Sequence, residues 1–461
     1  MKIMRHVRHN QLEFQPQNKS SIYTRELQEI ARILETVPQR AQLLEQVKRD
    51  IVRTGRTDTG AEGMTAEQVL RCALVRSIFN LPYRELAFAL EDSASIRAFV
   101  GVGFGKRFSS SALNRNIRLI REETWKRINE AIKSYAQQQG IENGKTIRGD
   151  TTTTETNIHY PTDTNLLWDC IRVLTRIMRG VREETTAQIE FTDHARRAKS
   201  RLYELNNSRK EQQRHQCSLD LIRLTRWTVA YAEAALVVVE KAESSSLEEL
   251  LLLQCARGEL QQYIPLAKRC FEQAYRRHVL KEEVPNADKL VSIFEPHTDI
   301  IVKGFRDTVF GHKLHVVSGK SSLILDCEIY RGNPADTSLV KPILDEHQRC
   351  YDSAPKQVAF DGGFASQGNL REAKDAGTTD VMFAKTRGLA PEELTSSPRA
   401  FRVLRRFRAG IEANISLLKR KFGWDRILER GFAAFRCVVR CAVVSFNLLL
   451  LARAHLRAQA T

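Results

Sequence analysis

The stretch from Lys145 to Thr156, Lys-Thr-Ile-Arg-Gly-Asp-Thr-Thr-Thr-Thr-Glu-Thr, marks a change from helical to β texture in this 461-residue chain. β-Branched residues dominate it, as they do in strands. Asp150 lies within this predicted strand, although strands disfavour aspartate. A polar residue that goes against a local preference is more often functional than a random one. We therefore take Asp150 as a candidate site residue, with Asp163 and Asp169 as nearby competitors on the same reasoning.

Strands and helices alternate downstream of this stretch. Residues 165–290 first form a large block with a helical pattern, rich in arginine and leucine. The elements expected after it are strands at 300–305, 313–318, 323–330, 358–360 and 380–384 and helices at 336–349, 366–376 and 402–421. Without the helical block, this order predicts a mixed sheet flanked by helices, which is an α/β architecture.

The chain before this stretch has a helical pattern from Thr65 onward. Thr65-Ala-Glu-Gln68 indicates a capping box, and apolar residues then recur at helical spacing. Several short helices follow, one of which carries Arg115 and Arg118 behind a run of serines. This compact all-helical domain suits a helix-turn-helix DNA reader and a dimerisation module about equally well. Residues 1–60 are polar and weakly patterned.

The net charge of the chain favours a polyanionic partner. The sequence has 72 lysine and arginine residues against 55 aspartate and glutamate residues, a formal charge of +17. An excess of this size favours nucleic acid first and an anionic membrane second. Nine cysteines without a C-x-x-C pair argue against a disulfide framework and against a cysteine-based zinc site.

We expect a cytosolic protein without a membrane partner. The N-terminal residues lack the apolar segment of a signal peptide. The most apolar stretch, Cys437 to Ala452, is interrupted by polar residues. It falls short of the ~20 apolar residues that a membrane span needs.

Two further carboxylates occupy positions that favour chemistry. Asp361 ends the short strand at 358–360 and precedes two glycines, which is where open α/β sheets place ligands, although it would equally cap a turn. Glu412 shares a polar stripe of the last predicted helix with Arg408 and Lys419, next to the apolar stripe. The alternative for Glu412 is an exposed ion pair with Arg408. Together with the candidate on the first strand, these acids could hold two divalent metals for phosphoryl transfer.

Five segments stand out in order along the chain. They are Gly149 to Asp163 (Gly-Asp-Thr-Thr-Thr-Thr-Glu-Thr-Asn-Ile-His-Tyr-Pro-Thr-Asp), Gly311-His-Lys-Leu-His315, Gly332-Asn-Pro-Ala-Asp336, Phe360-Asp-Gly-Gly363 and Arg408-x3-Glu412-x6-Lys419. Together they resemble bacterial insertion-sequence transposases of the DDE class, which have a ribonuclease-H-like catalytic core. The resemblance covers about residues 65–450. It departs from related families at Arg405, where those families have tyrosine.

The resemblance implies a ribonuclease-H-like mixed sheet core with a large helical insertion, preceded by an all-helical N-terminal domain that binds DNA ends. The expected parts are a polar segment at 1–60, a helical DNA-binding or dimerisation domain at 61–140, a catalytic core at 141–164 and 296–430, a helical insertion at 165–295 and a C-terminal helix at 431–461. His312 and His315 are expected to belong to the sheet rather than to a metal site.

The resemblance also implies a metal-dependent active site. Asp150, Asp361 and Glu412 are expected to be catalytic and to bind Mg²⁺, for which Mn²⁺ would substitute. In this hypothesis Asp150 bridges two ions and each of the other two acids completes the shell of one ion. Arg408 and Lys419 are expected to contact DNA phosphates without reading bases.

The implied function is cleavage of DNA at insertion-sequence ends, followed by attack of the freed 3′-hydroxyl on target DNA. The expected partners are double-stranded DNA, as element ends and as target, and a second copy of the chain in a synaptic homodimer. The expected location is the bacterial cytoplasm, at the nucleoid. Two alternatives stay open: a ribonuclease-H-like nuclease without strand transfer, and a non-catalytic DNA-binding regulator. The presence of all three acids argues against the regulator.

Overall fold

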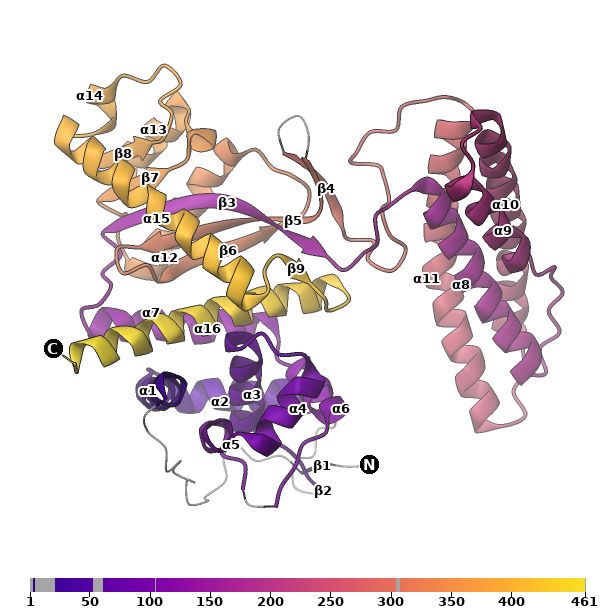
Figure 1. Ribbon diagram of the computed structural model, residues 1–461, viewed down its shortest axis with the longest axis horizontal. Helices are drawn as coiled ribbons and strands as arrows, with labels where there is room; N and C mark the ends of the chain where they lie inside the picture. Colours follow the sequence, from indigo (N-terminus) through magenta and orange to yellow (C-terminus); the bar gives the residue numbers. More distant parts are fainter. Residues whose placement is uncertain (1–2, 5–20, 53–60, 104, 304–306, 461) are drawn as a thin grey trace. The chain divides into compact units, whose positions relative to one another are not determined.

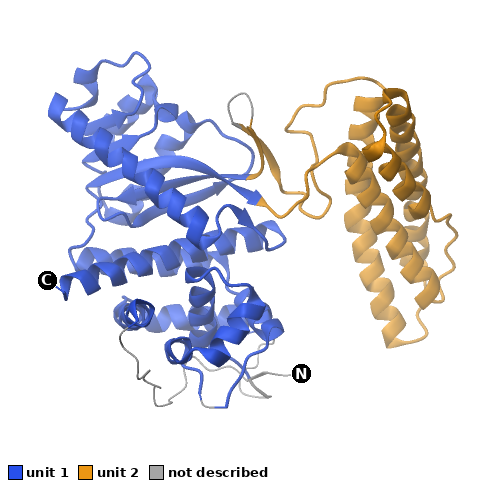
Figure 2. Ribbon diagram, viewed as in Figure 1, with its two compact units in different colours: residues 1–155, 312–461 blue, residues 156–311 orange. Residues whose placement is uncertain are grey.

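The computed structural model describes residues 3–4, 21–52, 61–103, 105–303 and 307–460 (Figure 1). The chain divides into two compact units, one formed by Met1–Glu155 with His312–Thr461 and the other by Thr156–Gly311 (Figure 2). The second unit is therefore an insertion in the sequence of the first. It contains the whole of the helical insertion expected at 165–295, while the finer division of the chain stays a prediction.

The first unit begins with helices, as the sequence predicts. They are α1 (Ile22–Thr36), α2 (Arg40–Ile51), α3 (Ala66–Ile78), α4 (Tyr83–Asp92), α5 (Ala94–Val100), α6 (Ser110–Ile117) and α7 (Glu122–Gln138), and the short strands β1 (Ile3–Met4) and β2 (Ala61–Glu62) pair beside them. The capping box is present at the start of α3. Thr65 Oγ1 accepts a 3.1 Å hydrogen bond from the Gln68 amide, and Gln68 Oε1 accepts one from the Thr65 amide.

Helices α1 and α2 correct the expectation that residues 1–60 form a polar, weakly patterned segment. Leu27, Ile30 and Ile33 of α1 are buried, and α1 packs against α16 (Phe432–Ala458). The apolar residues recur every three or four positions, which is a helical signal. Charged residues around them dilute that signal in the sequence.

The central sheet mixes parallel and antiparallel strands. Its strands are β3 (Thr146–Thr156), β4 (Asp299–Lys303), β5 (Asp307–Gly319), β6 (Ile324–Tyr330), β7 (Gln357–Phe360), β8 (Asp380–Phe383) and β9 (Arg426–Ile427). The order is β4-β5-β3-β7-β8, with β6 paired to β5 and β9 to β3. β5 and β6 are antiparallel, whereas β3, β7 and β8 are parallel. This arrangement confirms the α/β class, and His312 and His315 both lie in β5 as expected.

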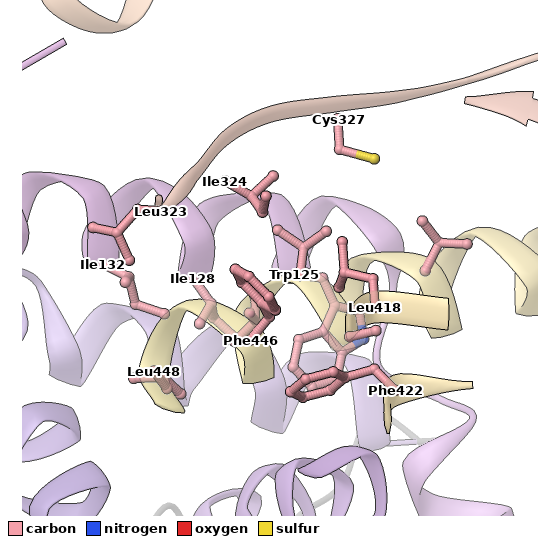
Figure 3. Close-up of a cluster of buried hydrophobic side chains, with 14 of the residues drawn as sticks. Trp125, Ile128, Ile132, Leu323, Ile324, Cys327, Leu418, Phe422, Phe446 and Leu448 are labelled. Carbon is pink, nitrogen blue, oxygen red and sulfur yellow. The ribbon is translucent and has the colours of Figure 1, made fainter. Parts of the chain in front are cut away.

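Helices cover the sheet and connect its strands. They are η1 (Asp336–Leu339), α12 (Val340–Tyr351), η2 (Gly362–Phe364), α13 (Gln367–Asp375), α14 (Pro391–Leu394), α15 (Pro398–Phe422) and α16. α15 crosses the sheet and packs on β7 and β8 (Figure 1). Figure 3 shows how α7, α15 and α16 share one apolar cluster, with Trp125 from α7, Phe422 from α15 and Phe446 from α16.

Helix α16 contains the most apolar stretch of the chain. By length and composition it is apolar enough to cross a membrane, whereas the sequence analysis placed the stretch from Cys437 to Ala452 below that limit. Of its most apolar 18-residue window, 72% is buried inside the protein. Its neighbours are α7, α1, α3 and β6. The helix is thus a core helix of the first unit, which explains its apolar composition.

The second unit has a core of its own, built by four long helices. They are α8 (Asp163–Glu184), α9 (Ala195–Asn207), α10 (Glu211–Lys241) and α11 (Leu247–His278). α8 and α10 each pack against the other three helices. Several arginines that made α8 conspicuous in the sequence pair with acids of the same unit: Arg172 with Asp169, Arg176 with Glu259 and Arg179 with Asp193. Ion pairing within the unit accounts for this part of the basic pattern.

A buried guanidinium joins the strand and the helix that carry the candidate acids. Arg148 of β3 is only 5% exposed. Its Nε and Nη2 donate 2.8 Å hydrogen bonds to the hydroxyls of Ser318 and Ser322, and its Nη1 donates one of 2.8 Å to the Phe407 carbonyl of α15. A methyl group on Gly410 of α15 would overlap Arg148 Nη1. The glycine therefore lets α15 approach the strand closely.

We expect Gly410→Ala to destabilise the first unit by about 1–3 kcal/mol, the usual cost of overpacking. This sign is opposite to that of helix propensity, which favours alanine over glycine by about 1 kcal/mol. The matched control is Gly258→Ala in α11, where the added methyl group would meet no described atom within 4 Å apart from its chain neighbours and the backbone of its own helix. This control should stabilise its unit by about 0.5–1 kcal/mol. Urea unfolding of both variants measures the difference, and stabilisation by Gly410→Ala would contradict the prediction.

Candidate active site

Parallel pairing of β3 with β7 brings Asp150 and Asp361 together. Gly149 is the register partner of Phe360, so each acid follows directly after a paired residue. Gly149 is needed at this contact, because a Cβ atom there would lie 2.8 Å from Cε1 of the Phe360 ring. The sheet backbone thus sets the positions of both acids, Asp150 inside β3 and Asp361 directly after the end of β7.

Helix α15 supplies Glu412 and, one turn earlier, Arg408. Arg408 Nη2 lies 2.9 Å from Asp150 Oδ2 and 3.1 Å from Asp361 Oδ1, and its Nη1 lies 2.9 Å from Glu412 Oε1. The structure therefore gathers the three sequence-predicted acids around one guanidinium. The Arg408–Glu412 ion pair considered as an alternative is present too, but it is one part of this larger cluster. Lys419 lies further along α15 and pairs with Asp425.

The three acids differ in exposure. The side chain of Asp150 is 16% exposed, that of Asp361 is 42% exposed and that of Glu412 is 63% exposed. Burial raises the pKa of Asp150 above its ordinary value, while the hydrogen bond from the Thr151 amide and the charge of Arg408 act in the opposite direction. The Thr151 amide and the Arg408 guanidinium therefore offset part of the effect of burial on this carboxylate.

The donor set fits a hard divalent cation. Carboxylate oxygens are the ligands that Mg²⁺ and Mn²⁺ prefer. Arg408 is the cation among them, and its Nε is buried without a hydrogen-bond partner in the described part of the chain. Across the described ranges, no group of three or more histidine, cysteine, aspartate or glutamate side chains is arranged to hold a metal as it stands. A divalent ion would therefore require Arg408 to turn away from the acids.

The competing acids Asp163 and Asp169 are engaged elsewhere. Both lie in the second unit, where Asp163 accepts hydrogen bonds from Gln273 and Arg277. Asp169 pairs with Arg172. Of the three candidates Asp150, Asp163 and Asp169, it is therefore Asp150 that contacts Arg408.

Helix α15 also has a basic surface that was not among the site residues predicted from the sequence. The helix carries eight lysine and arginine residues against the single acid Glu412. Arg402, Arg405 and Arg406 are exposed, and the described residues offer them no ion pair. Arg405 lies two helical turns before Glu412 and therefore on the same side of the helix. The excess of arginine between 399 and 408 is the signal that could have found this surface.

The positive charge of the chain is concentrated in the unit that contains this site. Residues 156–311 have 23 lysine and arginine residues against 22 aspartate and glutamate residues. The rest of the chain has 49 against 33. The electrostatic attraction for a polyanion therefore arises almost entirely from the first unit.

Comparison with known proteins agrees with this geometry. Residues 303–448 match the family model of the transposase DDE domain, and the matched range includes Asp361, Arg408 and Glu412. No curated protein and no solved structure matches the chain. A transposase domain implies an enzyme that acts on DNA. Residues 303–448 are therefore similar to the transposase DDE domain, which supports the resemblance to insertion-sequence transposases of the DDE class.

Proposed function

We propose that this protein cleaves DNA at the ends of an insertion sequence and joins the freed strands to target DNA, in a reaction that depends on Mg²⁺ or Mn²⁺. The observation that carries this proposal is the convergence of Asp150, Asp361 and Glu412 on a single cation, Arg408. The convergence lies in a chain whose DDE domain match includes the last two of these acids. A regulator that only binds DNA has no need for three acids held so close together.

Asp150, Asp361 and Glu412 are the residues that would hold the metal. A divalent cation held by these side chains would supply Lewis-acid stabilisation of the charge that develops on the oxygens of the scissile phosphate. Asp150 is fixed within a strand of the sheet and Asp361 directly follows another, whereas Glu412 lies on an exposed helix face and has room to adjust. In this proposal Asp150 and Asp361 would hold the metal from fixed positions, and Glu412 would adjust to complete the site.

In this proposal Arg408 has one role in the metal-free protein and another when metal is bound. Before metal binds, its guanidinium neutralises the acids. Once displaced, it can donate to a phosphate oxygen, since a guanidinium forms paired hydrogen bonds to phosphate. The unpaired Nε of Arg408 supports this second role. Lys419, on the same helix, is the other proposed phosphate contact.

The exposed α15 arginines extend this surface along the DNA backbone. Arg402, Arg405 and Arg406 would neutralise phosphates next to the scissile bond without reading its sequence. Arg405 stands where related families have tyrosine, and in this proposal it contacts a phosphate. Two DNA ends must be held together for joining, and we therefore propose a homodimer that acts at the nucleoid in the cytoplasm.

We expect Asp361→Asn to abolish end cleavage while DNA binding persists. The amide keeps the size of the side chain but removes a metal-binding charge, and a loss of at least about 100-fold is expected from removal of one such electrostatic contact. The assay incubates DNA that carries the sequences flanking the gene with protein and Mg²⁺ or Mn²⁺, and scores cleavage and joining separately.

The control for this experiment is Asp345→Asn, which removes an exposed carboxylate of α12 that pairs with Lys341. It should behave like the wild type. Cleavage without joining by the wild-type protein would favour the nuclease. Binding without cleavage under either metal would favour the regulator, and full activity of Asp361→Asn would remove Asp361 from the site.

We expect Arg402→Gln, Arg405→Gln and Arg406→Gln each to lower by about 1 the slope of log affinity for DNA against log salt concentration. The loss should be similar for all DNA sequences, because these contacts are made to phosphate. Fluorescence anisotropy at several salt concentrations measures the slope. Arg226→Gln in α10 is the control, since Arg226 is exposed and has no ion pair among the described residues but lies in the nearly neutral unit. An equal loss in the control would contradict the assignment.

A further inference from the structure

Two of the five conspicuous segments have no role in the site described so far. One is Gly311-His-Lys-Leu-His315 in β5, and the other is Gly332-Asn-Pro-Ala-Asp336, which leads into η1. Lys313 Nζ lies 2.6 Å from Asp336 Oδ1 and donates a 2.7 Å hydrogen bond to the Pro334 carbonyl. The Lys313 side chain is 11% exposed and that of Asp336 is 23% exposed. The two segments are thus joined by a largely buried ion pair.

One oxygen of Asp336 contacts the segment of Asp150. Thr151 Oγ1 donates a 3.2 Å hydrogen bond to Asp336 Oδ1. The amide of the same threonine donates a 2.7 Å hydrogen bond to Asp150 Oδ1. Thr151 therefore connects Asp336 to the candidate metal ligand through one residue.

The other oxygen of Asp336 faces the segment of Asp361. Gly363 lies two residues beyond Asp361, and a methyl group on it would overlap Asp336 Oδ2. Glycine at 363 is therefore a requirement of this contact, and not only of the turn. The carboxylate of Asp336 lies between the two chain segments that carry Asp150 and Asp361.

A second residue reinforces the contact between η1 and η2. Asn369 is 7% exposed, and its Nδ2 donates hydrogen bonds of 2.8 Å to the Thr337 carbonyl and 2.7 Å to the Phe364 carbonyl. The residue after Asp336 and the residue after Gly363 are thus held by one buried amide. Asp336 therefore has little freedom to move relative to η2.

We propose that Asp336, held by Lys313, is a positioning residue that fixes the spacing between Asp150 and Asp361. The inference rests on the proposed function, in which these two acids bind a divalent cation. Small divalent ions such as Mg²⁺ demand ligands close to ideal geometry, and functional groups must be held within about 0.5 Å for this. In this role Asp336 is not itself a ligand of the metal. It acts through Thr151 and Gly363.

The test is the affinity of the full-length, DNA-free protein for Mn²⁺, measured by the electron paramagnetic resonance signal of the free ion during titration. Asp336→Ala and Lys313→Met should each weaken Mn²⁺ binding by about 10–100-fold, the usual effect of losing a residue that orients metal ligands. Lys313→Arg keeps the cation and should restore most of the affinity. DNA binding measured by gel shift should stay within about twofold of the wild type.

The matched control is Asp345→Ala, which removes the acid of an exposed aspartate–lysine pair on the neighbouring α12. It should leave Mn²⁺ affinity unchanged. Asp336→Asn serves if Asp336→Ala fails to fold, because it keeps the size of the side chain and an acceptor for Thr151 while losing the charge that pairs with Lys313. Thermal unfolding of each variant separates a folding defect from a positioning defect.

A double variant tests the contact itself. Gly363→Ala should weaken Mn²⁺ binding in the wild-type background and add little in the Asp336→Ala background, because the clashing carboxylate is then absent. Full additivity of the two effects would overturn the inference. So would wild-type Mn²⁺ affinity in Asp336→Ala and Lys313→Met, and the proposed function would still stand. A wild-type protein that neither binds Mn²⁺ nor cleaves DNA would overturn both.

Discussion

The guanidinium of Arg148 ties together the pieces on which the site depends. Its three hydrogen bonds reach two serines at the β5–β6 turn and a backbone carbonyl of α15. Asp150 follows two residues later on the same strand, and Glu412 follows two residues after Gly410 on the same helix. Burial lowers the pKa of Arg148, but its hydrogen-bonding partners compensate for the lost water. Arg148 thus fixes β3, which carries Asp150, relative to α15, which carries Glu412.

A second guanidinium, that of Arg408, reduces the repulsion between the three carboxylates. Three carboxylates that converge without a cation would repel one another. Arg408 supplies the charge that lets the chain fold with its acids already gathered. Arg148 is buried, and each nitrogen of its guanidinium donates a hydrogen bond to a serine or to a backbone carbonyl. Arg408 is held mainly by the three acids. The first arginine is therefore structural, and the second is suited to exchange its partners.

Much of this site could be predicted from the sequence, and the reasons are specific. Asp361 follows a short apolar strand, the position at which open α/β sheets place ligands, whereas Asp150 lies inside a β-rich run that disfavours aspartate. Glu412 was visible through the polar stripe that flanks an apolar one. Arg408 was expected to contact phosphate, and its position among all three acids required the three-dimensional structure. Asp336 has no local signal for its contacts, because they depend on the pairing of segments about 185 residues apart.

The differences between the expected and the observed helices α1 and α16 have physical causes as well. α1 was missed because buried residues such as Ile30 and Ile33 are interspersed with charged ones, and the average polarity hides their spacing. α16 was underestimated because Arg440 interrupts its apolar run. In the structure Arg440 is 7% exposed, and its charge is met by Glu122 and Glu328. A buried and fully paired arginine costs the helix far less than its charge in the sequence indicates.

The ends of the inserted unit are tied to each other within that unit. Thr156 Oγ1 lies 2.8 Å from Thr298 Oγ1 and donates a 3.4 Å hydrogen bond to the Phe310 carbonyl. Without this closure, β3 and the second half of β5 would be separated by a loop of 156 residues, and bringing its ends together would cost conformational entropy. Four helices with mostly local contacts can form early and shorten the part of that loop that is still free. The four-helix core of the insertion thus offsets part of the entropy cost that the length of the insertion imposes on assembly of the sheet.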